Sequence, residues 1–476
     1  MRRKIYEKLL QWKNNDAPDT AVLIDGARRV GKSYVAEQFA KAEYKSYILI
    51  DFNIAPSEVK AIFEENLDDL GEFFKKISSY YAVPLYVGET LFIFDEVQEF
   101  PRARAAIKYL VADGRYHYLE TGSLISIQEN VAHIVIPSEE DHIKMYPLDF
   151  EEFLWATGRE GLVDVISSHY HDREPMGAAH RKATDAFREY LAVGGMPQAV
   201  VKWVETSDLK KVDAAKRRII ALYRADIRKH AGKYAMKAEA IFDEIPGQLQ
   251  KHDKKFRLSA LGEEARTREY GEAFLWLKDA MTVNVAYNAT EPSAGLALSA
   301  EQSTMKCYLA DTGLLVSLAF GANPKAVEDA HRRIIFDSLS FNKGMLIENA
   351  VAQMLVAQGL DLFFYSRYDK VDAEKRMEID FLVANAEMRR IKNVTAVEVK
   401  SEKDYSTTSL DKFRAKFKAN VGGGIILHPG DLSLTKGVSR FPLYMTPWID
   451  WRYQSNGETS VRKSASAHEV RGDCHA

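Results

Sequence analysis

The sequence predicts an α/β protein with several domains, and three observations lead to that prediction. Between Thr20 and Ser123, short β-rich runs alternate with helical stretches, as in a parallel sheet covered by helices. A second alternation of helix and strand fills residues 344–429. The chain has 476 residues, which at roughly 100–200 residues per domain corresponds to more than one domain.

Composition and charge are those of an ordinary folded protein. Apolar residues make up 46% and charged residues 28% of the chain, which excludes wholesale disorder and collagen-like structure. The net charge is −3, so no overall positive field attracts the molecule to nucleic acid or to an anionic membrane, and any such contact must be local. The two cysteines, Cys307 and Cys474, form neither a disulfide framework nor a cysteine-rich zinc module. With so few cysteines, we expect a cytoplasmic protein. Because no stretch of about 18 residues stays apolar, we expect no membrane span.

The elements of the first half follow from local patterns. The N-terminal segment is expected to form an ordinary helix rather than a secretory signal, because Tyr6, Leu9 and Trp12 recur at helical spacing among charged residues. A turn at 145–148 leads into a long helical region that is broken near 194–197. The predicted strands are residues 20–24, 46–52, 90–94, 116–120 and 132–137.

The second half divides into two further units. Two or three helices followed by a β-hairpin, between about 234 and 320, are the layout of a winged helix. A polar link near 321–333 precedes the compact α/β unit. The expected segments are a nucleotide-binding core at 1–155, a helical lid at 156–232, a winged helix at 233–330, an α/β unit at 331–454 and a disordered tail at 455–476.

A phosphate-binding loop is predicted at residues 26–33, GARRVGKS, which match the pattern GxxxxGK[ST] between an apolar run and a helical segment. The glycines let backbone N–H groups face the phosphates, Lys32 reaches the β- and γ-phosphates, and Ser33 binds Mg²⁺. Arg28 and Arg29 either contact nucleotide or a neighbouring subunit, or are solvated surface arginines. The predicted cofactors are therefore ATP and Mg²⁺. The candidate nucleotide-binding residues are Gly26, Arg28, Arg29, Val30, Gly31, Lys32, Ser33, Tyr34 and Asp95.

Two carboxylates end the apolar strand 91–94. Asp95 is expected to hold the Mg²⁺ shell and Glu96 to polarise the water that attacks the γ-phosphate. Buried strands often end in acids, so this pair becomes specific only because the phosphate-binding loop lies upstream. At the tip of the next strand, Ser123 is the first candidate and Thr121 the second for a hydroxyl that contacts the γ-phosphate or the water. A plain serine/threonine turn is the competing interpretation.

With these motifs, the chain resembles bacterial and archaeal AAA-type ATPases that carry a C-terminal domain of unknown function. The resemblance covers nearly the whole chain except the tail, and it implies ATP hydrolysis by a P-loop AAA+ core, a winged helix and a C-terminal unit similar to the PD-(D/E)xK, or restriction-endonuclease-like, nucleases. The motifs are GARRVGKS, LFIFDEVQ, LETGSL, YPLDFEEFL and GGMPQAV in the first half, and LKDA, YLADTGLL, LIENAVAQML, MEIDFLV and VEVKS in the second. Many members place an arginine between the sensor strand and the YPL motif, where this chain offers Lys144 and no arginine, so the resemblance does not support a trans-acting arginine finger or an obligate hexameric ring here.

The C-terminal unit places acids where metal chemistry needs them. Glu398 and Lys400 are two residues apart in one strand and leave the same face. If the strand that holds Asp380 pairs with the strand of Glu398 and Lys400, the side chains of all three residues converge. The two carboxylates can then bind Mg²⁺ beside the ammonium group of Lys400. Glu348 supplies the third acid of the PD-(D/E)xK pattern that the sequence resembles. The competing interpretation is a set of edge-strand residues with a weak Glu/Lys pair.

The predicted winged helix is locally basic. Clustered cations of this kind bind DNA phosphates when a helix enters the major groove. Glu263 and Glu264 lie among them and would repel phosphate, so a protein contact or a purely structural role is an equal alternative. The basic residues are Lys251, Lys254, Lys255, Arg257, Arg266 and Arg268.

These patterns lead to one functional hypothesis and one alternative. The first is a Mg-dependent ATPase coupled to a DNA-directed nuclease-like half, with Lys32, Glu96, Ser123 and Lys400 as catalytic residues and Ser33, Asp95, Glu348, Asp380 and Glu398 as metal ligands. The alternative is a nucleotide-gated signalling or assembly switch whose nuclease-like unit is inactive and binds a protein partner. Either version is compatible with a homo-oligomer.

Overall fold

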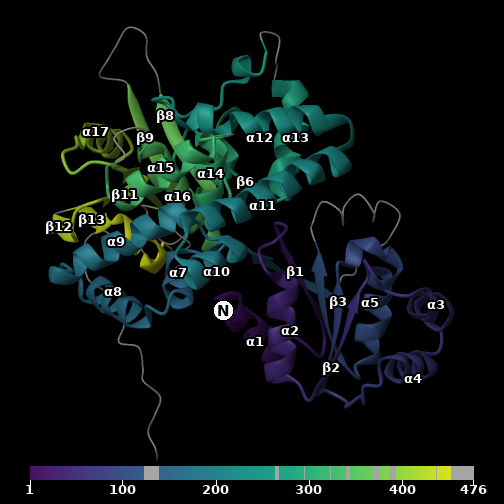
Figure 1. Cartoon of the computed structure of the whole chain (residues 1–476). Coiled ribbons are helices and arrows are strands. Elements are labelled where there is room, and N and C mark those ends of the chain that lie inside the picture. The colour runs from purple at the N-terminus through teal and green to yellow at the C-terminus, as the bar shows by residue number, and fades with distance from the viewer. Residues whose placement is uncertain are drawn as a thin grey trace, which may run out of the picture.

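The computed structural model describes residues 1–122, 139–262, 267–293, 295–321, 323–338, 343–367, 376–384, 393–435 and 437–451. Two sheets organise these residues, each in its own lobe of the molecule (Figure 1). Within this described part of the chain, no helix is long and apolar enough to cross a membrane. The predicted tail at 455–476 lies outside the described residues.

The first sheet has five parallel strands in the order β2-β3-β4-β1-β5. β1 and β3 are buried at every position, which explains why they appear as continuous apolar runs rather than alternating ones. Helices cover both faces, with α1 and α2 on one side and α3, α4 and α5 on the other (Figure 1). The strands are β1 (Ala21–Gly26), β2 (Ser46–Asp51), β3 (Thr90–Asp95), β4 (His117–Gly122) and β5 (Glu140–Met145); the helices are α1 (Ile5–Asn15), α2 (Lys32–Glu43), α3 (Ser57–Glu65), α4 (Leu70–Tyr81) and α5 (Pro101–Asp113).

Four of the predicted strands of this sheet are confirmed, and the fifth stays untested. The predicted strand 132–137 lies outside the described residues. β5, which pairs with β1 along its length, begins only at Glu140. Its sequence, EDHIKM, is mostly polar and half-exposed because β5 is an edge strand, so the apolar pattern that predicted the other strands is missing.

The helical region that follows is broken where the sequence predicted. α7 begins with a capping box, in which Asp149 and Glu152 each accept a hydrogen bond from the other's backbone N–H. Gly195 lies in the break and is required to be glycine, because a Cβ atom there would lie 2.1 Å from the carbonyl oxygen of Leu148. The helices are α7 (Phe150–Ala156), α8 (Glu160–Asp172), α9 (Ala178–Val193), α10 (Pro197–Thr206) and α11 (Leu209–His230).

The second sheet has eight strands in the order β12-β13-β11-β10-β9-β8-β6-β7. The predicted hairpin is confirmed, since β6 and β7 are antiparallel, but the other edge of β6 is paired in parallel with β8. The hairpin of the expected winged helix therefore shares one sheet with the expected α/β unit. The strands are β6 (Val283–Ala289), β7 (Ala300–Leu309), β8 (Leu362–Arg367), β9 (Met377–Ala384), β10 (Val394–Val399), β11 (Val421–His428), β12 (Ser433–Thr435) and β13 (Val438–Pro442).

The expected polar link near 321–333 is wrong, because residues Pro324–Ile335 form helix α15. Asn323 caps its first turn, Pro324 stands at its first position, and Val327, Ala330 and Ile334 are buried along one face. That face has helical spacing, which the many charges of the other face obscured. The expected domain boundary at 330/331 falls inside this helix. The remaining helices of this half are α12 (Ala235–Leu249), α13 (Thr267–Asp279), α14 (Thr312–Ala319), α16 (Lys343–Ala357) and α17 (Thr408–Lys416).

Candidate functional site

The phosphate-binding loop has the backbone that its motif requires. It joins β1 to α2, whose first residue is Lys32, so the helix N-terminus faces the loop. A Cβ atom on Gly26 would lie 2.3 Å from the carbonyl oxygen of Met145 on the neighbouring strand β5. Gly31 has φ +98°, a left-handed conformation that favours glycine. Close packing against β5 therefore explains one glycine of the motif, and backbone conformation the other.

The side chain of Lys32 turns back and contacts the backbone of the phosphate-binding loop. Its side chain is buried, and Nζ donates hydrogen bonds to the carbonyl oxygens of Gly26, at 2.9 Å, and Ala27, at 3.3 Å. Burial lowers the pKa of Lys32, while the nearby carboxylates of Glu96 and Asp95 act in the opposite direction. The ammonium group is thus held at the centre of the loop, where anionic phosphate oxygens would be stronger acceptors than the two carbonyls.

Ser33 and Asp95 come together as the sequence predicted. The hydroxyl of Ser33 donates to Asp95 Oδ1 at 2.7 Å, and the hydroxyl of Thr121 donates to the same oxygen. Burial raises the pKa of Asp95, and the two hydrogen bonds oppose that shift. A carboxylate and a hydroxyl at one point are oxygen ligands of the kind that Mg²⁺ prefers, so this pair fits a magnesium ion beside the phosphates.

Glu96 follows β3 in a left-handed conformation, with φ 52°. Its backbone N–H donates to Thr121 Oγ1 at 3.3 Å, and its carboxylate accepts a hydrogen bond from the side chain of Gln98. The second candidate at the tip of β4, Thr121, therefore contacts the site directly, whereas Ser123 lies outside the described residues. The role of Ser123 stays a prediction.

The other loop residues lie in different surroundings. Val30 is fully buried, and its carbonyl oxygen accepts a hydrogen bond from Arg3 at 3.0 Å. Arg29 has φ 72° and is exposed, as are Tyr34 at the start of α2 and Lys144 on β5. Arg28 forms an ion pair with Asp226, which lies on helix α11 of the helical region.

Helix α11 closes over the phosphate-binding loop. Asp226 forms an ion pair with Arg28, and Tyr223, one turn earlier, donates its hydroxyl to the carbonyl oxygen of Arg28 at 3.1 Å. The space left between loop, α11 and α13 measures only about 50 Å³ and is lined by Lys32, Glu96 and Trp276 among others. That is far below the roughly 300–1,000 Å³ of a typical small-molecule site. Tyr223 and Asp226 were not predicted from the sequence, because nothing local marks a helix residue that meets a loop almost 200 positions away.

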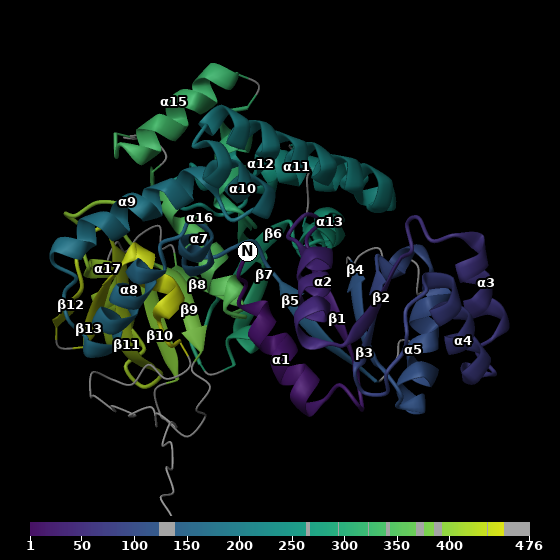
Figure 2. The same ribbon diagram turned by 60° about the horizontal axis from the view of Figure 1, so that its bottom comes forward.

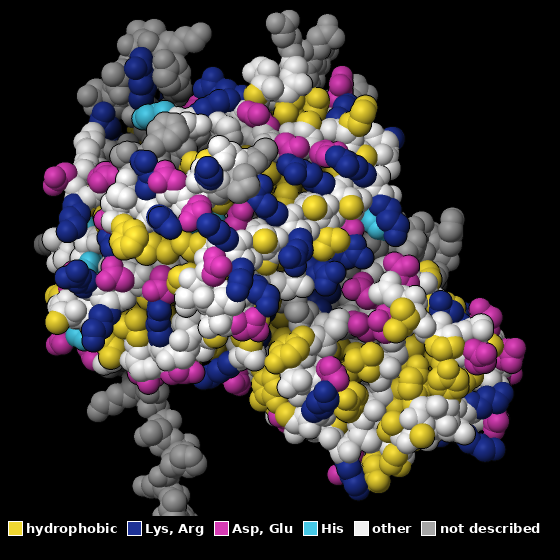
Figure 3. Space-filling model, in the orientation of Figure 1, with side chains coloured by type: hydrophobic (Ala, Val, Ile, Leu, Met, Phe, Trp, Pro, Cys, Tyr) yellow, Lys and Arg dark blue, Asp and Glu magenta, His cyan; other side chains and the backbone are white. Residues whose placement is uncertain are grey.

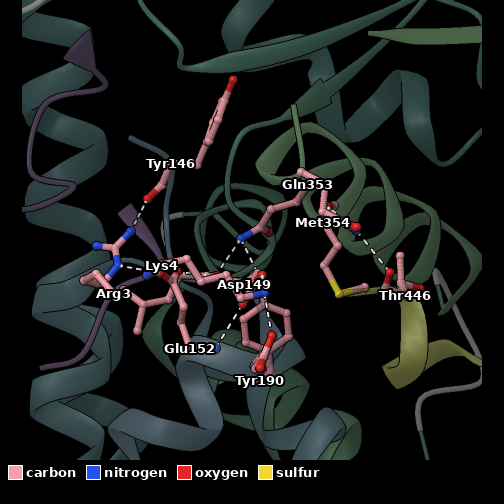
Figure 4. A network of polar contacts seen from close by, with 12 residues as sticks. Arg3, Lys4, Tyr146, Asp149, Glu152, Tyr190, Gln353, Met354 and Thr446 are labelled. Carbon is pink, nitrogen blue, oxygen red and sulfur yellow. Dashed lines mark hydrogen bonds and ion pairs between the residues drawn. The ribbon is translucent and has the colours of Figure 1, made fainter. Parts of the chain in front are cut away.

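The N-terminus was also missed as part of the site. The guanidinium of Arg3 binds the carbonyl oxygen of Tyr146 at 2.6 Å and Glu152 Oε1 at 3.1 Å, in addition to the loop carbonyl already described (Figure 4). Lys4 beside it pairs with Asp149 at 2.5 Å. Arg3 is itself buried, so this cation joins the phosphate-binding loop to the YPLDFEEFL segment that leaves the first sheet.

A buried polar cluster joins four of the sequence motifs. Asp311 accepts a hydrogen bond from the backbone N–H of Gly195, at 2.5 Å, and Gln353 donates to the hydroxyl of Tyr190 at 2.9 Å. Tyr190 in turn donates to the carbonyl oxygen of Leu148 at 2.9 Å (Figure 4). The residues come from the helical region, the segment after β5, the start of α14 and the middle of α16. The two lobes are therefore connected through satisfied buried hydrogen bonds rather than by a flexible linker.

The far end of α11 contacts the C-terminal half. Asp213 accepts a hydrogen bond from Ser317 of α14 at 2.7 Å, and Lys216 Nζ lies 2.7 Å from His331 Nε2 of α15. Both Lys216 and His331 are fully buried. Figure 2 shows α11 running from beside α15 toward the five-stranded sheet. One helix thus contacts the phosphate-binding loop near its C-terminal end and the second lobe near its N-terminal end.

The C-terminal residues converge as predicted. β9 and β10 are antiparallel, with Phe381 opposite Val397. Asp380 Oδ2 accepts a hydrogen bond from the backbone N–H of Val399 at 2.8 Å, and Lys400 Nζ lies 2.7 Å from Glu398 Oε2. Burial raises the pKa of both Asp380 and Glu398.

Two lysines that were not predicted to belong to this site lie among these acids. Lys306 of β7 is fully buried, and its Nζ lies 3.2 Å from Glu348 Oε1, 3.0 Å from Glu378 Oε1 and 3.7 Å from Asp380 Oδ1. Lys254, expected to face DNA, pairs instead with Glu348 at 2.5 Å. Burial opposes the charge of Glu348, but the two ammonium groups outweigh it and lower its pKa to about 2.

This arrangement differs from the expected metal site in one respect. Among the described residues, no group of three or more His, Cys, Asp or Glu side chains is arranged to hold a metal ion. Glu348, Asp380 and Glu398 as joint metal ligands therefore stay a prediction. What the sheet brings together is a cluster of carboxylates with ammonium groups between them.

Comparison with protein families divides the chain into three matched regions. Residues 18–154 match the model described as "AAA domain", residues 184–325 match a domain of unknown function (DUF8612), and residues 343–445 match another (DUF4143). No curated protein matches the chain.

Solved structures show only a distant likeness. The Aeropyrum pernix ORC2 protein is 15% identical, with 71% of this chain and 95% of that chain covered and a TM-score of 0.33. CDC6P from Pyrobaculum aerophilum is 12% identical, with 71% and 96% covered and a TM-score of 0.24. The S. cerevisiae Hsp104-ADP complex is 13% identical, with 76% and 52% covered and a TM-score of 0.26. TM-scores this low carry no argument about fold or function.

The family match and the geometry agree on the first lobe. The matched residues contain β1, the phosphate-binding loop, Asp95 and Glu96, and the five-stranded parallel sheet that positions them. The two models that match the second half describe domains of unknown function, and neither description names a nuclease. Residues 18–154 of this protein form an AAA-type ATPase domain.

Proposed function

We propose that the protein is a Mg-dependent ATPase that uses nucleotide binding to change the relation between its AAA domain and a DNA-directed C-terminal half. The observation that carries this proposal is the closure of α11 over the phosphate-binding loop. Because only about 50 Å³ remains between loop, α11 and α13, a triphosphate at Lys32 must displace the contacts of Arg28 with Tyr223 and Asp226.

The chemistry is divided among residues of the loop and the two strand ends. Lys32 exchanges its carbonyl partners for phosphate oxygens, and Ser33 and Asp95 hold Mg²⁺, which compensates phosphate charge when it is bound. Glu96 orients the attacking water and takes its proton, and Thr121 keeps Asp95 in place through its hydrogen bond. Ser123 remains a candidate for a further hydroxyl contact to the γ-phosphate.

The coupling follows from the other end of the same helix. A displacement of α11 at the loop acts on Asp213 and Lys216, which contact α14 and α15. Those contacts are buried and hydrogen-bonded, so α14 and α15 are expected to move together with α11 rather than separate from it. ATP binding and hydrolysis would thereby reorient the second lobe.

The ATPase is tested with Lys32→Ala. We expect the variant to lose ATP turnover, while Lys41→Ala, an exposed lysine on the same helix, keeps it. Hydrogen exchange of α11 and α13 should rise when a slowly hydrolysed ATP analogue is added to the native protein, and it should not change in Lys32→Ala. Full turnover in Lys32→Ala, or unchanged exchange in the native protein with bound analogue, would remove the proposal.

A second candidate function is Mg²⁺-dependent cleavage of DNA by the C-terminal half. The proximity of Asp380, Glu398 and Lys400 at the ends of paired strands favours it. The test is cleavage of labelled linear, branched and single-stranded DNA with Mg²⁺ or Mn²⁺, with and without ATP. Cleavage should disappear in Asp380→Ala and persist in Asp411→Ala, an exposed aspartate of α17.

The alternative to cleavage is a switch whose second lobe only binds its target or a protein partner. The position of Lys306 among Glu348, Glu378 and Asp380 favours it, because a resident ammonium group already neutralises the acids that a metal would need. No cleavage under any condition, with ATP turnover intact, would select this alternative.

A further inference from the structure

A groove of about 1470 Å³ lies on the second lobe, away from the phosphate-binding loop. Its walls are residues 251–253 and 255–258 after α12, residues 303–305 of β7, and residues 366–367 and 376–378 at the ends of β8 and β9. These segments are far apart in the sequence, and the eight-stranded sheet brings them together. The groove therefore exists only because the β6–β7 hairpin shares a sheet with β8 and β9.

The groove is basic, although the whole protein is not. Its cationic lining residues are Lys251, Lys255, Arg257, Arg367 and Arg376, and its carboxylates are Asp253 and Glu378. Asp253 is paired with Arg257 at 2.6 Å, and Glu378 with Lys306 at 3.0 Å. The face of the larger lobe seen in Figure 3 carries both Lys/Arg and Asp/Glu side chains. Since the net charge of the protein is −3, the excess of cations in the groove is a local feature.

Hydroxyl groups lie among the cations. Ser303 and Thr304 of β7, Ser366 of β8 and Ser409 of α17 line the same groove. Lysine, arginine and hydroxyl side chains are the groups that bind phosphate oxygens of a nucleic-acid backbone. Cations on both walls suit a chain of phosphates that runs along a groove, rather than a single phosphate or a flat lipid surface.

We propose that this groove binds the phosphodiester backbone of a nucleic acid strand. The proposal rests on the proposed DNA-directed function and gives it a location. Glu378 lines the groove and binds Lys306, which also contacts Asp380, so a strand in the groove passes beside the carboxylate cluster. Lys255 and Arg367, from two different walls, contact the backbone electrostatically, and affinity accordingly depends on salt.

The test measures binding of fluorescein-labelled duplex DNA, single-stranded DNA and single-stranded RNA to the full chain by anisotropy over a range of salt concentrations. The double variant Lys255→Ala/Arg367→Ala should bind at least about tenfold more weakly. For duplex DNA, the logarithm of the association constant falls as the logarithm of the salt concentration rises. This dependence should become less steep, by about 0.9 for each phosphate that the variant no longer neutralises. Lys255→Arg/Arg367→Lys, which conserves the charge, should bind as the native protein does.

The matched control is Lys108→Ala/Lys211→Ala, which removes the same charge from exposed positions on α5 and α11. A urea unfolding curve for each variant shows that it is folded. If native protein binds nucleic acid and both double alanine variants weaken binding equally, the groove is not the site, although the DNA-directed function stands. If the native protein binds none of the three nucleic acids, the groove proposal and the DNA-directed part of the proposed function are both wrong, whereas the ATPase is decided by the Lys32→Ala test.

Discussion

Arg28 in the phosphate-binding loop forms an ion pair with Asp226 near the end of α11, and this contact spans the two lobes of the protein. In the proposed function, this is the contact that nucleotide binding at the loop displaces. On the same helix, Lys216 Nζ lies 2.7 Å from His331 Nε2 of α15. Helix α11 therefore connects Arg28 of the phosphate-binding loop to the second lobe.

The first prediction concerns Asp226→Asn. Because α11 must leave the loop before ATP can bind, removal of the ion pair should tighten nucleotide binding. The side chain of Arg28 is 45% exposed, so the gain is that of a surface ion pair, at most about fivefold in Kd. The measurement is titration with a fluorescent ATP analogue. The control is Asp243→Asn on α12, which breaks an exposed ion pair with Arg224 of α11. Equal ATP-analogue affinities in the two variants would contradict the prediction.

The second prediction separates binding from hydrolysis at Glu96. Glu96→Gln keeps the shape and the contact with Gln98 but cannot take a proton from water, so ATP affinity should stay near the native value. Turnover should fall by roughly 100-fold to 10,000-fold, the usual contribution of a general base. A steady-state ATPase assay beside equilibrium binding measures both quantities. A variant that turns over ATP at the native rate would show that another group activates the water.

The third prediction concerns the buried cluster at Asp311. Asp311→Ala removes hydrogen bonds to the backbone N–H groups of Gly195 and Leu314, at 2.5 and 2.8 Å, and leaves both donors buried. We expect the free energy of unfolding to fall by about 2–4 kcal/mol, measured in urea. Asp69→Ala removes an exposed N-cap of α4 and should cost only about 1 kcal/mol. Similar decreases in the two variants would mean that Asp311 only caps α14.

The fourth prediction is a pH dependence that comes from Glu348. Its pKa is lowered from 4.5 to about 2, so its ion pairs with Lys254 and Lys306 stabilise the fold fully above pH 4.5, and this stabilisation is lost as the pH falls toward 2. Glu348→Gln should lower the free energy of unfolding by about 3–5 kcal/mol at neutral pH, because it leaves buried ammonium groups short of a partner.

The difference between native protein and Glu348→Gln should shrink as the pH falls from 4.5 toward 2, because Glu348 of the unfolded chain takes up a proton in this range while the folded protein, with its lower pKa, does not. Urea unfolding at several pH values measures this difference, and Glu402→Gln, at an exposed position, is the control. A difference that stays constant down to pH 2 would show that the ion pairs do not carry the stability.

Local sequence was sufficient for much of the first lobe. The glycines at 26 and 31, the lysine after them and the acids after an apolar strand are close in the chain to the elements that position them, so their geometry follows from short-range rules. The convergence of Asp380 with Glu398 was likewise predictable, since it needs only one pair of antiparallel strands. Helix α15 was missed although its signal is local, because its charged face concealed a three-residue apolar stripe.

The sequence by itself determined which residues form the phosphate-binding loop, which acids follow β3, and four of the five strands of the first sheet. Only the tertiary structure decided that α11 covers that loop, that the hairpin β6–β7 joins β8, and that Lys306 lies among the acids of the second lobe. The physical reason is that these contacts join side chains 40 to almost 200 residues apart. Hydrophobic periodicity shows which face of an element is buried, but the partner across that face is selected by packing and hydrogen bonding of the whole fold.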